Sequence, residues 1–114
     1  MENFIVKKQY TIPELRAMAA ETFGDMVKAV ADITTGDVAF SNSMHSDAEK
    51  LLLEQGSAQE NLWGFNIYPD SPEESMLEFQ SLINIRPRQN NRTLEIQDTA
   101  VQEKVKSIVK KIIT

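Results

Sequence analysis

Apolar residues recur at two different periods along the chain, and each change of period marks a new element. Across residues 12–23 the apolar positions lie three and four apart, which predicts a helix with one buried stripe. Thr11 and Glu14 have the spacing of a capping box at its start, and Gly24 offers a left-handed stop at its end. A short extended segment, residues 4–6, precedes this helix and can supply an extra strand.

The next segment alternates with a period of two. Ala29, Ala31 and Ile33 fall on one face, as expected of a strand with one buried side. Thr35-Gly36 separates this strand from a second apolar run, residues 37–40. This spacing predicts a tight hairpin.

Two further helices are predicted from their caps and apolar stripes. Ser46 and Glu49 form a possible capping box, and Gly56 marks an end about three turns later. Thr99 and Gln102 have the same spacing at the start of the last helix. The apolar stripe of that last helix comprises Val101, Val105, Ile108 and Ile112.

The clearest strand signal lies in residues 62–68. Trp63, Phe65 and Ile67 alternate there with smaller or more polar neighbours, so we assign these three side chains to the core. Residues 77–85 repeat the alternation, which places Leu77, Phe79, Ser81, Ile83 and Ile85 on the same kind of inward face. We therefore expect the two segments to pair antiparallel.

The element order predicted by these patterns is α-β-β-α-β-β-α. It indicates an α+β fold, in which a mainly antiparallel sheet of four or five strands carries three helices on one face, as a two-layer sandwich. Half-buried alternation favours this arrangement over a doubly wound sheet, whose strands would be continuously apolar. The 114 residues suffice for one core, so we expect a single domain over residues 1–114.

Composition and charge narrow the classes of function. Because the chain has no cysteine, disulfide frameworks, iron–sulfur clusters and cysteine nucleophiles are excluded. A net charge of −5 disfavours nucleic acid and anionic lipid as partners. No apolar run approaches the length of a membrane span, and residues 1–4 lack the features of a signal peptide. We therefore expect a cytoplasmic protein with no nucleic-acid or membrane partner.

The most concentrated positive charge lies in residues 86–92, which hold three arginines and no acid. Guanidinium groups bind carboxylates and phosphates through two-pronged hydrogen bonds. In the predicted register, two asparagines share the outer face of the sheet with the first arginine. The candidate ligand-binding residues are therefore Asn66, Asn84, Arg86, Arg88 and Arg92.

A structural role is the alternative for the same residues. Arg86 can pair with Glu78 across the sheet, and Asn90-Asn91 can occupy left-handed turn positions. Gly64, inside the predicted strand, can likewise mark a close approach of another group.

The single histidine, His45, is the candidate for acid–base chemistry. Asp47 or Asp32 could orient its ring, and Arg86 or Arg92 could clamp an anionic substrate. The alternative is a capping and packing role at the start of the second helix. One histidine among scattered carboxylates lacks the paired ligands of a zinc site, and the chain contains neither a phosphate-binding glycine loop nor a dinucleotide fingerprint. We expect no metal and no cofactor.

Several segments resemble a family of short bacterial proteins known only as a domain of unknown function. They are residues 60–69, 83–87 and 91–92, with residues 44–47 and 54–57 also similar, and the resemblance spans residues 26–112. It implies a bacterial, cytoplasmic, stand-alone domain and supplies no activity. Asn90 stands where the family pattern leads us to expect a glycine.

Three hypotheses of function follow. The first is a non-enzymatic binding or interaction domain for a small anion or an acidic protein partner. The second is a small hydrolase-like enzyme, which requires His45 and the arginines to converge on one cavity. The third, which rests only on the net charge, is an acidic domain that neutralises a basic partner.

Overall fold

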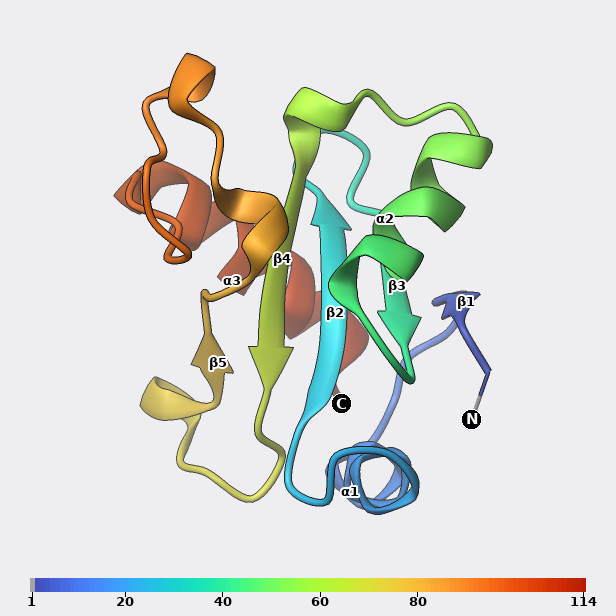
Figure 1. The fold of residues 1–114 in the computed structure, drawn as a ribbon. Coiled ribbons are helices and arrows are strands. Elements are labelled where there is room, and N and C mark those ends of the chain that lie inside the picture. The colour runs from blue at the N-terminus through green and yellow to red at the C-terminus, as the bar shows by residue number, and fades with distance from the viewer. Residues whose placement is uncertain (1) are drawn as a thin grey trace.

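One five-stranded sheet runs through the centre of the molecule, in the order β1-β3-β2-β4-β5, and every strand pairing in it is antiparallel (Figure 1). The computed structural model describes residues 2–114, so Met1, where we looked for the start of a targeting signal, lies outside the described residues. The strands are β1 (Phe4–Ile5), β2 (Val27–Asp32), β3 (Val38–Ser41), β4 (Leu62–Ile67) and β5 (Leu77–Glu78). The helices are α1 (Ile12–Glu21), α2 (His45–Glu54) and α3 (Thr99–Ile112). The predicted α+β class and element order are confirmed.

The helices cover both faces of the sheet, whereas the sequence prediction placed them on one. In Figure 1, α3 lies behind the sheet, α2 lies in front of it, and α1 closes its lower end. Side chains of α1 and α3 share one hydrophobic core with the back of the sheet. On the front face, Ala48 and Leu52 of α2 form a second, smaller core with Val30, Ala39 and Leu62. Small residues on both sides of this contact allow α2 to lie close to the strands.

The main core contains the three large side chains that the alternation in β4 predicted. Trp63, Phe65 and Ile67 are all buried there, in the same cluster as Val105 and Val109 of α3. Each such fully buried side chain stabilises the fold by about 1.5–3 kcal/mol relative to exposure. The predicted orientation of β4 is therefore confirmed.

The capping residues recognised in the sequence predict the first residue of each helix to within one or two positions. The capping box of Thr11 and Glu14 at α1 is confirmed. The other two predicted caps are wrong by one or two residues: the N-cap position of α2 is Met44, which makes no side-chain capping hydrogen bond, and that of α3 is Asp98, whose carboxylate accepts from the Ala100 N–H at 2.8 Å. Asp98 precedes the helix directly, and its oxygen replaces one of the missing intrahelical acceptors.

The predicted last strand is wrong beyond Glu78. The chain leaves the sheet there and forms a 3₁₀ turn, Leu82–Asn84, because the Ser81 hydroxyl accepts from the Ile83 N–H at 3.3 Å and caps the turn. The turn carries the chain across the front of β4, so Ile83 packs against the smaller core and Ile85 is exposed. Among residues 2–114, no helix is long and apolar enough to cross a membrane.

Candidate functional site

Residues 82–94 form a lobe that folds against the front of β4 at its start, and we call it the arginine lobe. Gly64 makes this contact possible. A Cβ atom at Gly64 would lie 2.5 Å from the Ser81 Cβ and 2.6 Å from the Ser81 Oγ. The expected close approach of another group at Gly64 therefore exists, and that group is the protein's own chain.

Asn84 fastens the lobe to β4 and is wholly buried. Its amide accepts from the Gly64 N–H at 2.8 Å and donates to the Gly64 carbonyl at 2.9 Å and to the Leu94 carbonyl at 3.1 Å. Asn91 continues the network by donating to the Asn84 carbonyl at 2.7 Å. The side chain of Asn84 is therefore a structural bridge that no ligand in solvent can reach.

Arg86 is also held within the fold. Its Nε donates to the Ile83 carbonyl at 3.0 Å, and its two terminal nitrogens donate to a further four acceptors. These acceptors are the carbonyls of Gln59 and Leu62 and the side chains of Glu49 and Gln89. A guanidinium has five N–H donors, so no donor is left for an anion. The guanidinium carbon also lies 4.8 Å from the centroid of the Trp63 ring.

Asn66 completes the predicted polar face, and it is also covered. Its Nδ2 donates to Glu78 Oε1 at 2.8 Å, and only 5% of the residue is exposed. Its Oδ1 is buried without a hydrogen-bond partner in the part of the chain that the structure describes. Asn66, Asn84 and Arg86 thus do not share the open face that the predicted register implied, because α2 and the lobe cover that side of β4. The Arg86 carboxylate partner is Glu49, not Glu78.

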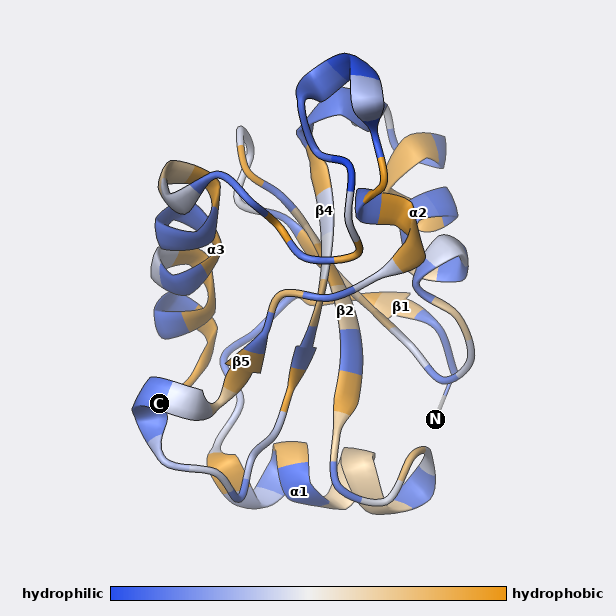
Figure 2. Cartoon of the chain, turned by 60° about the vertical axis from the view of Figure 1, so that its left-hand side comes forward, coloured by the Kyte–Doolittle hydropathy of each residue, from blue (hydrophilic) through white to orange (hydrophobic). Residues whose placement is uncertain are grey.

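Arg88 and Arg92 lie exposed at the tip of the lobe. Within residues 2–114, neither guanidinium has an ion-pair or hydrogen-bond partner. The same lobe exposes three large apolar side chains: Leu82 at 71%, Ile85 at 44% and Leu94 at 40%. We call these five residues the docking face. Figure 2 shows the hydrophilic tip of the lobe projecting beyond the start of β4.

The exposed apolar side chains of the docking face were not predicted from the sequence, and the reason is physical. Strict alternation in residues 77–85 assigned Ile85 to the core together with Leu77 and Phe79. After the chain leaves the sheet at Glu78, that alternation no longer corresponds to one face. The segment 82–94 combines aliphatic residues, arginines and turn-forming asparagines. This composition is a signal that could have predicted an exposed lobe with apolar side chains on its surface.

His45 lies at the first turn of α2, with Nε2 3.0 Å from the Phe65 carbonyl oxygen. Because a carbonyl only accepts, Nε2 carries the hydrogen and donates it. Burial lowers the pKa of His45, and the charge of Lys28 lowers it further, against the opposing effects of the Phe65 carbonyl, Asn66 and Glu78. The ring is therefore neutral at pH 7.

Neither predicted carboxylate orients His45. Asp47 accepts from the Met44 N–H at 3.4 Å, and Asp32 accepts from the Thr34 and Thr35 N–H groups in the β2–β3 turn. Asp32 pairs with Leu62 at one end of β4, whereas His45 bonds to Phe65 further along. Among the described residues, no group of three or more histidine, cysteine or acidic side chains is arranged to hold a metal ion.

The environment of His45 makes the stability of the protein depend on pH. Because its folded pKa is lowered, the unfolded chain binds more protons just below the ordinary histidine pKa of about 6.5. The contribution of His45 is therefore complete above that pH and is lost as the pH falls through the lowered value. We expect His45→Gln, whose amide can still donate to Phe65, to flatten this dependence.

Urea denaturation from pH 7.5 to pH 5 measures this effect. The free energy of unfolding of the wild type should fall relative to that of the variant as the pH is lowered. An opposite trend would show that the folded protein favours charged His45.

Comparison with known proteins identifies the family. A family model described as "Protein of unknown function (DUF5674)" matches residues 4–112. The chain belongs to the DUF5674 family. The resemblance to a domain of unknown function is confirmed, and the match reaches closer to the amino terminus than residue 26, where the resemblance begins. No curated protein and no solved structure matches the chain.

The three main segments that carry the resemblance, residues 60–69, 83–87 and 91–92, lie against one another in this DUF5674 chain. Asn84 and Arg86, in the second segment, bond to the backbone of β4 in the first, and Asn91, in the third, bonds to the Asn84 carbonyl. The motifs of the resemblance therefore meet in one hydrogen-bonded unit, with the docking face on its outer side.

Proposed function

We propose that this DUF5674 protein is an interaction domain whose docking face binds an acidic segment of a protein partner that also carries apolar side chains. The observation that supports this proposal is that one lobe, residues 82–94, exposes three aliphatic side chains and two arginines whose guanidinium groups have no ion-pair or hydrogen-bond partner among residues 2–114. Single exposed apolar residues are normal on a protein surface, whereas several apolar side chains together with arginine on one exposed segment are typical of interaction sites.

The internal bonds of the lobe favour binding. Arg86 and Asn91 use their donors within the fold, so they hold the lobe in one shape before a partner arrives. A loop that is already ordered loses less conformational entropy on binding than a flexible one. The arginines that are not needed for this support, Arg88 and Arg92, remain available for carboxylates.

The chemistry of the docking face favours a peptide segment over a small inorganic anion. A small anion would engage the two guanidinium groups and leave the three aliphatic side chains in water. A segment that combines glutamate or aspartate with leucine or phenylalanine would satisfy both. The net charge of −5 opposes acidic partners at long range, so the contact depends on these local groups.

A peptide-display selection against the whole protein tests the proposal, with Arg88→Glu/Arg92→Glu as the decoy. Enriched peptides should be acidic and contain apolar anchors. Their affinity, measured by fluorescence anisotropy, should fall about tenfold or more in Arg88→Ala/Arg92→Ala, because each removed charge-assisted hydrogen bond contributes about 1.5–3 kcal/mol. The melting temperature should change by less than about 2 °C, since both side chains are exposed.

The matched control is Lys104→Ala/Lys111→Ala, which removes two exposed cations from α3. This variant should bind the selected peptides as the wild type does. Equal loss in both variants would indicate a general charge effect. Enrichment of peptides that bind wild type and decoy alike would contradict the proposal.

A further inference from the structure

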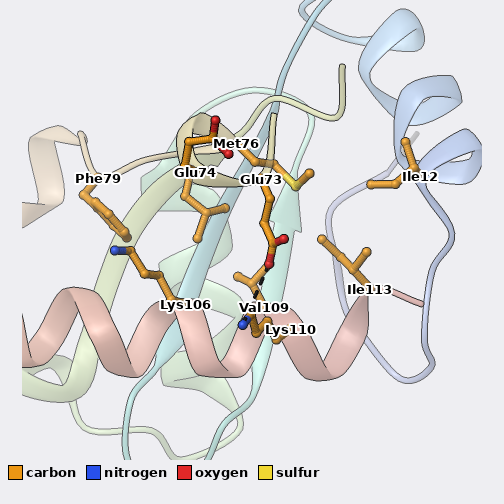
Figure 3. A pocket seen from close by; sticks show the side chains of 10 residues that line it. Ile12, Glu73, Glu74, Met76, Phe79, Lys106, Val109, Lys110 and Ile113 are labelled. Atoms are coloured by element: carbon orange, nitrogen blue, oxygen red, sulfur yellow. Dashed lines mark ion pairs between the residues drawn. The ribbon is translucent and has the colours of Figure 1, made fainter. Parts of the chain in front are cut away.

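A cavity of about 650 Å³ lies between α3 and the segment that leads into and out of β5 (Figure 3). It shares no residue with the docking face. Its walls are mostly apolar and come from three parts of the chain: Ile12, Met76, Leu77, Phe79, Val109 and Ile113. Its volume lies within the range of about 300–1,000 Å³ that is typical of small-molecule sites.

The cavity lies at the edge of the sheet formed by β5. This edge strand has only two residues, and Leu77 of the strand and the flanking Met76 and Phe79 line the cavity. Met76, Leu77 and Phe79 are half-buried against the main core, so they present apolar surface to the cavity. An apolar molecule in the cavity would remove this surface from water, which is favourable in proportion to the area covered.

Four charged residues stand at the mouth, and they are not equivalent. Lys110 Nζ lies 3.8 Å from Glu73 Oε1, and this ion pair joins α3 to the segment before β5 (Figure 3). Lys106 faces the cavity beside the Phe79 ring, with its Nζ 6.0 Å from the ring centroid. Its carboxylate partner is Glu103, 3.3 Å away and on its own helix.

The Lys106–Glu103 pair is exposed, at 49% and 71% of the two side chains. Exposed pairs of this kind are weak, because water screens them and two long side chains must be ordered. A ligand carboxylate can therefore replace Glu103 at Lys106 at little cost. A second carboxylate at the far end of an apolar body would lie against the apolar walls of the cavity, where an unpaired charge is unfavourable.

We infer that the cavity binds a monocarboxylate with an apolar body. The body lies between the β5 segment and α3, and the carboxylate lies at Lys106 beside Phe79. Lys106 attracts a single negative charge, and the apolar lining disfavours a second one at the other end of the body. This site is independent of the proposed interaction with an acidic partner.

Three eight-carbon probes test the inference by NMR titration of the whole protein. Octanoate should shift the amide signals of residues 73–79 and 106–113. Octan-1-ol, which lacks the charge, and octanedioate, which has two, should each bind several-fold more weakly. Equal affinities of octanoate and octan-1-ol, shifts confined to other parts of the fold, or no binding of millimolar octanoate would overturn the inference.

Two single variants of exposed lysines provide the matched comparison. Lys106→Glu should weaken octanoate binding at least tenfold and leave octan-1-ol binding nearly unchanged. Lys104→Ala, on the same helix but outside the cavity lining, should bind octanoate as the wild type does. Arg88→Ala/Arg92→Ala should also leave octanoate binding unchanged, so failure here is distinguishable from failure of the proposed interaction. Wild-type affinity of Lys106→Glu for octanoate would overturn the assignment of the carboxylate.

Discussion

Gly64→Ala is expected to lower the free energy of unfolding by about 3 kcal/mol, the upper part of the range for overpacked cores. The new methyl group would lie 2.5 Å from the Ser81 Cβ, 2.6 Å from its Oγ and 3.1 Å from the Ile83 Cγ1. The backbone of β4 cannot shift to relieve this contact, since it is hydrogen-bonded to β2 along its whole length. Urea denaturation at pH 7.5 measures the loss.

A second substitution separates this steric effect from other consequences of losing a glycine. Gly64→Ala/Ser81→Gly removes both Ser81 atoms that the methyl group would meet. We expect the double variant to be more stable than the sum of the single effects allows, with a coupling energy of about 1–2 kcal/mol. Ser81→Gly alone should cost about 1 kcal/mol, because the cap on Ile83 is lost. Strictly additive effects would show that the two residues do not compete for space.

Asn84→Ala is expected to destabilise the protein by about 3–5 kcal/mol. The substitution leaves the Gly64 N–H and the Gly64 carbonyl without their side-chain partner, while the Leu94 carbonyl keeps the hydrogen bond from the Ser81 N–H. Each buried polar group left unpaired costs about 1–3 kcal/mol. Asn84 has no exposed surface, so water cannot easily substitute for the amide.

The matched control for Asn84 lies in the same lobe. Asn90 has a φ of +60°, in the left-handed region, and glycine adopts this conformation freely. Asn90→Gly should therefore change stability by less than about 0.5 kcal/mol. The denaturant midpoints of the two variants measure these losses of stability. A loss at Asn84 no larger than that at Asn90 would show that its amide does not hold the lobe.

Most of the sheet could be predicted from the sequence, because a period of two directly reports which side of a strand is buried. Trp63, Phe65 and Ile67 point into the main core as the alternation required, and β2 and β3 form the predicted hairpin, although residues 33–37 connect them in place of the predicted two-residue turn. The same rule failed for residues 77–85. There, the alternation continues while the chain changes face, because Asn84 bonds to Gly64, twenty residues earlier. A local period carries no information about such a distant contact.

The candidate site was harder to predict than the fold, and Arg86 shows why. Three of the five acceptors that hold its guanidinium are backbone carbonyls: those of Gln59, Leu62 and Ile83. Every residue has a carbonyl, so the sequence does not distinguish an arginine that binds carbonyls within the fold from one that is free for a ligand. Arg88 and Arg92, only two and six residues further on, lie exposed.

The stacking of Arg86 on Trp63 gives the protein a built-in optical reporter. Trp63 is the single tryptophan of the chain, and it lies in the core, only 4% exposed, where β4 meets the lobe. Detachment of the lobe would admit water to the indole and move its emission to longer wavelength. Intrinsic fluorescence can therefore follow local opening of this region without a label and without unfolding the rest of the chain.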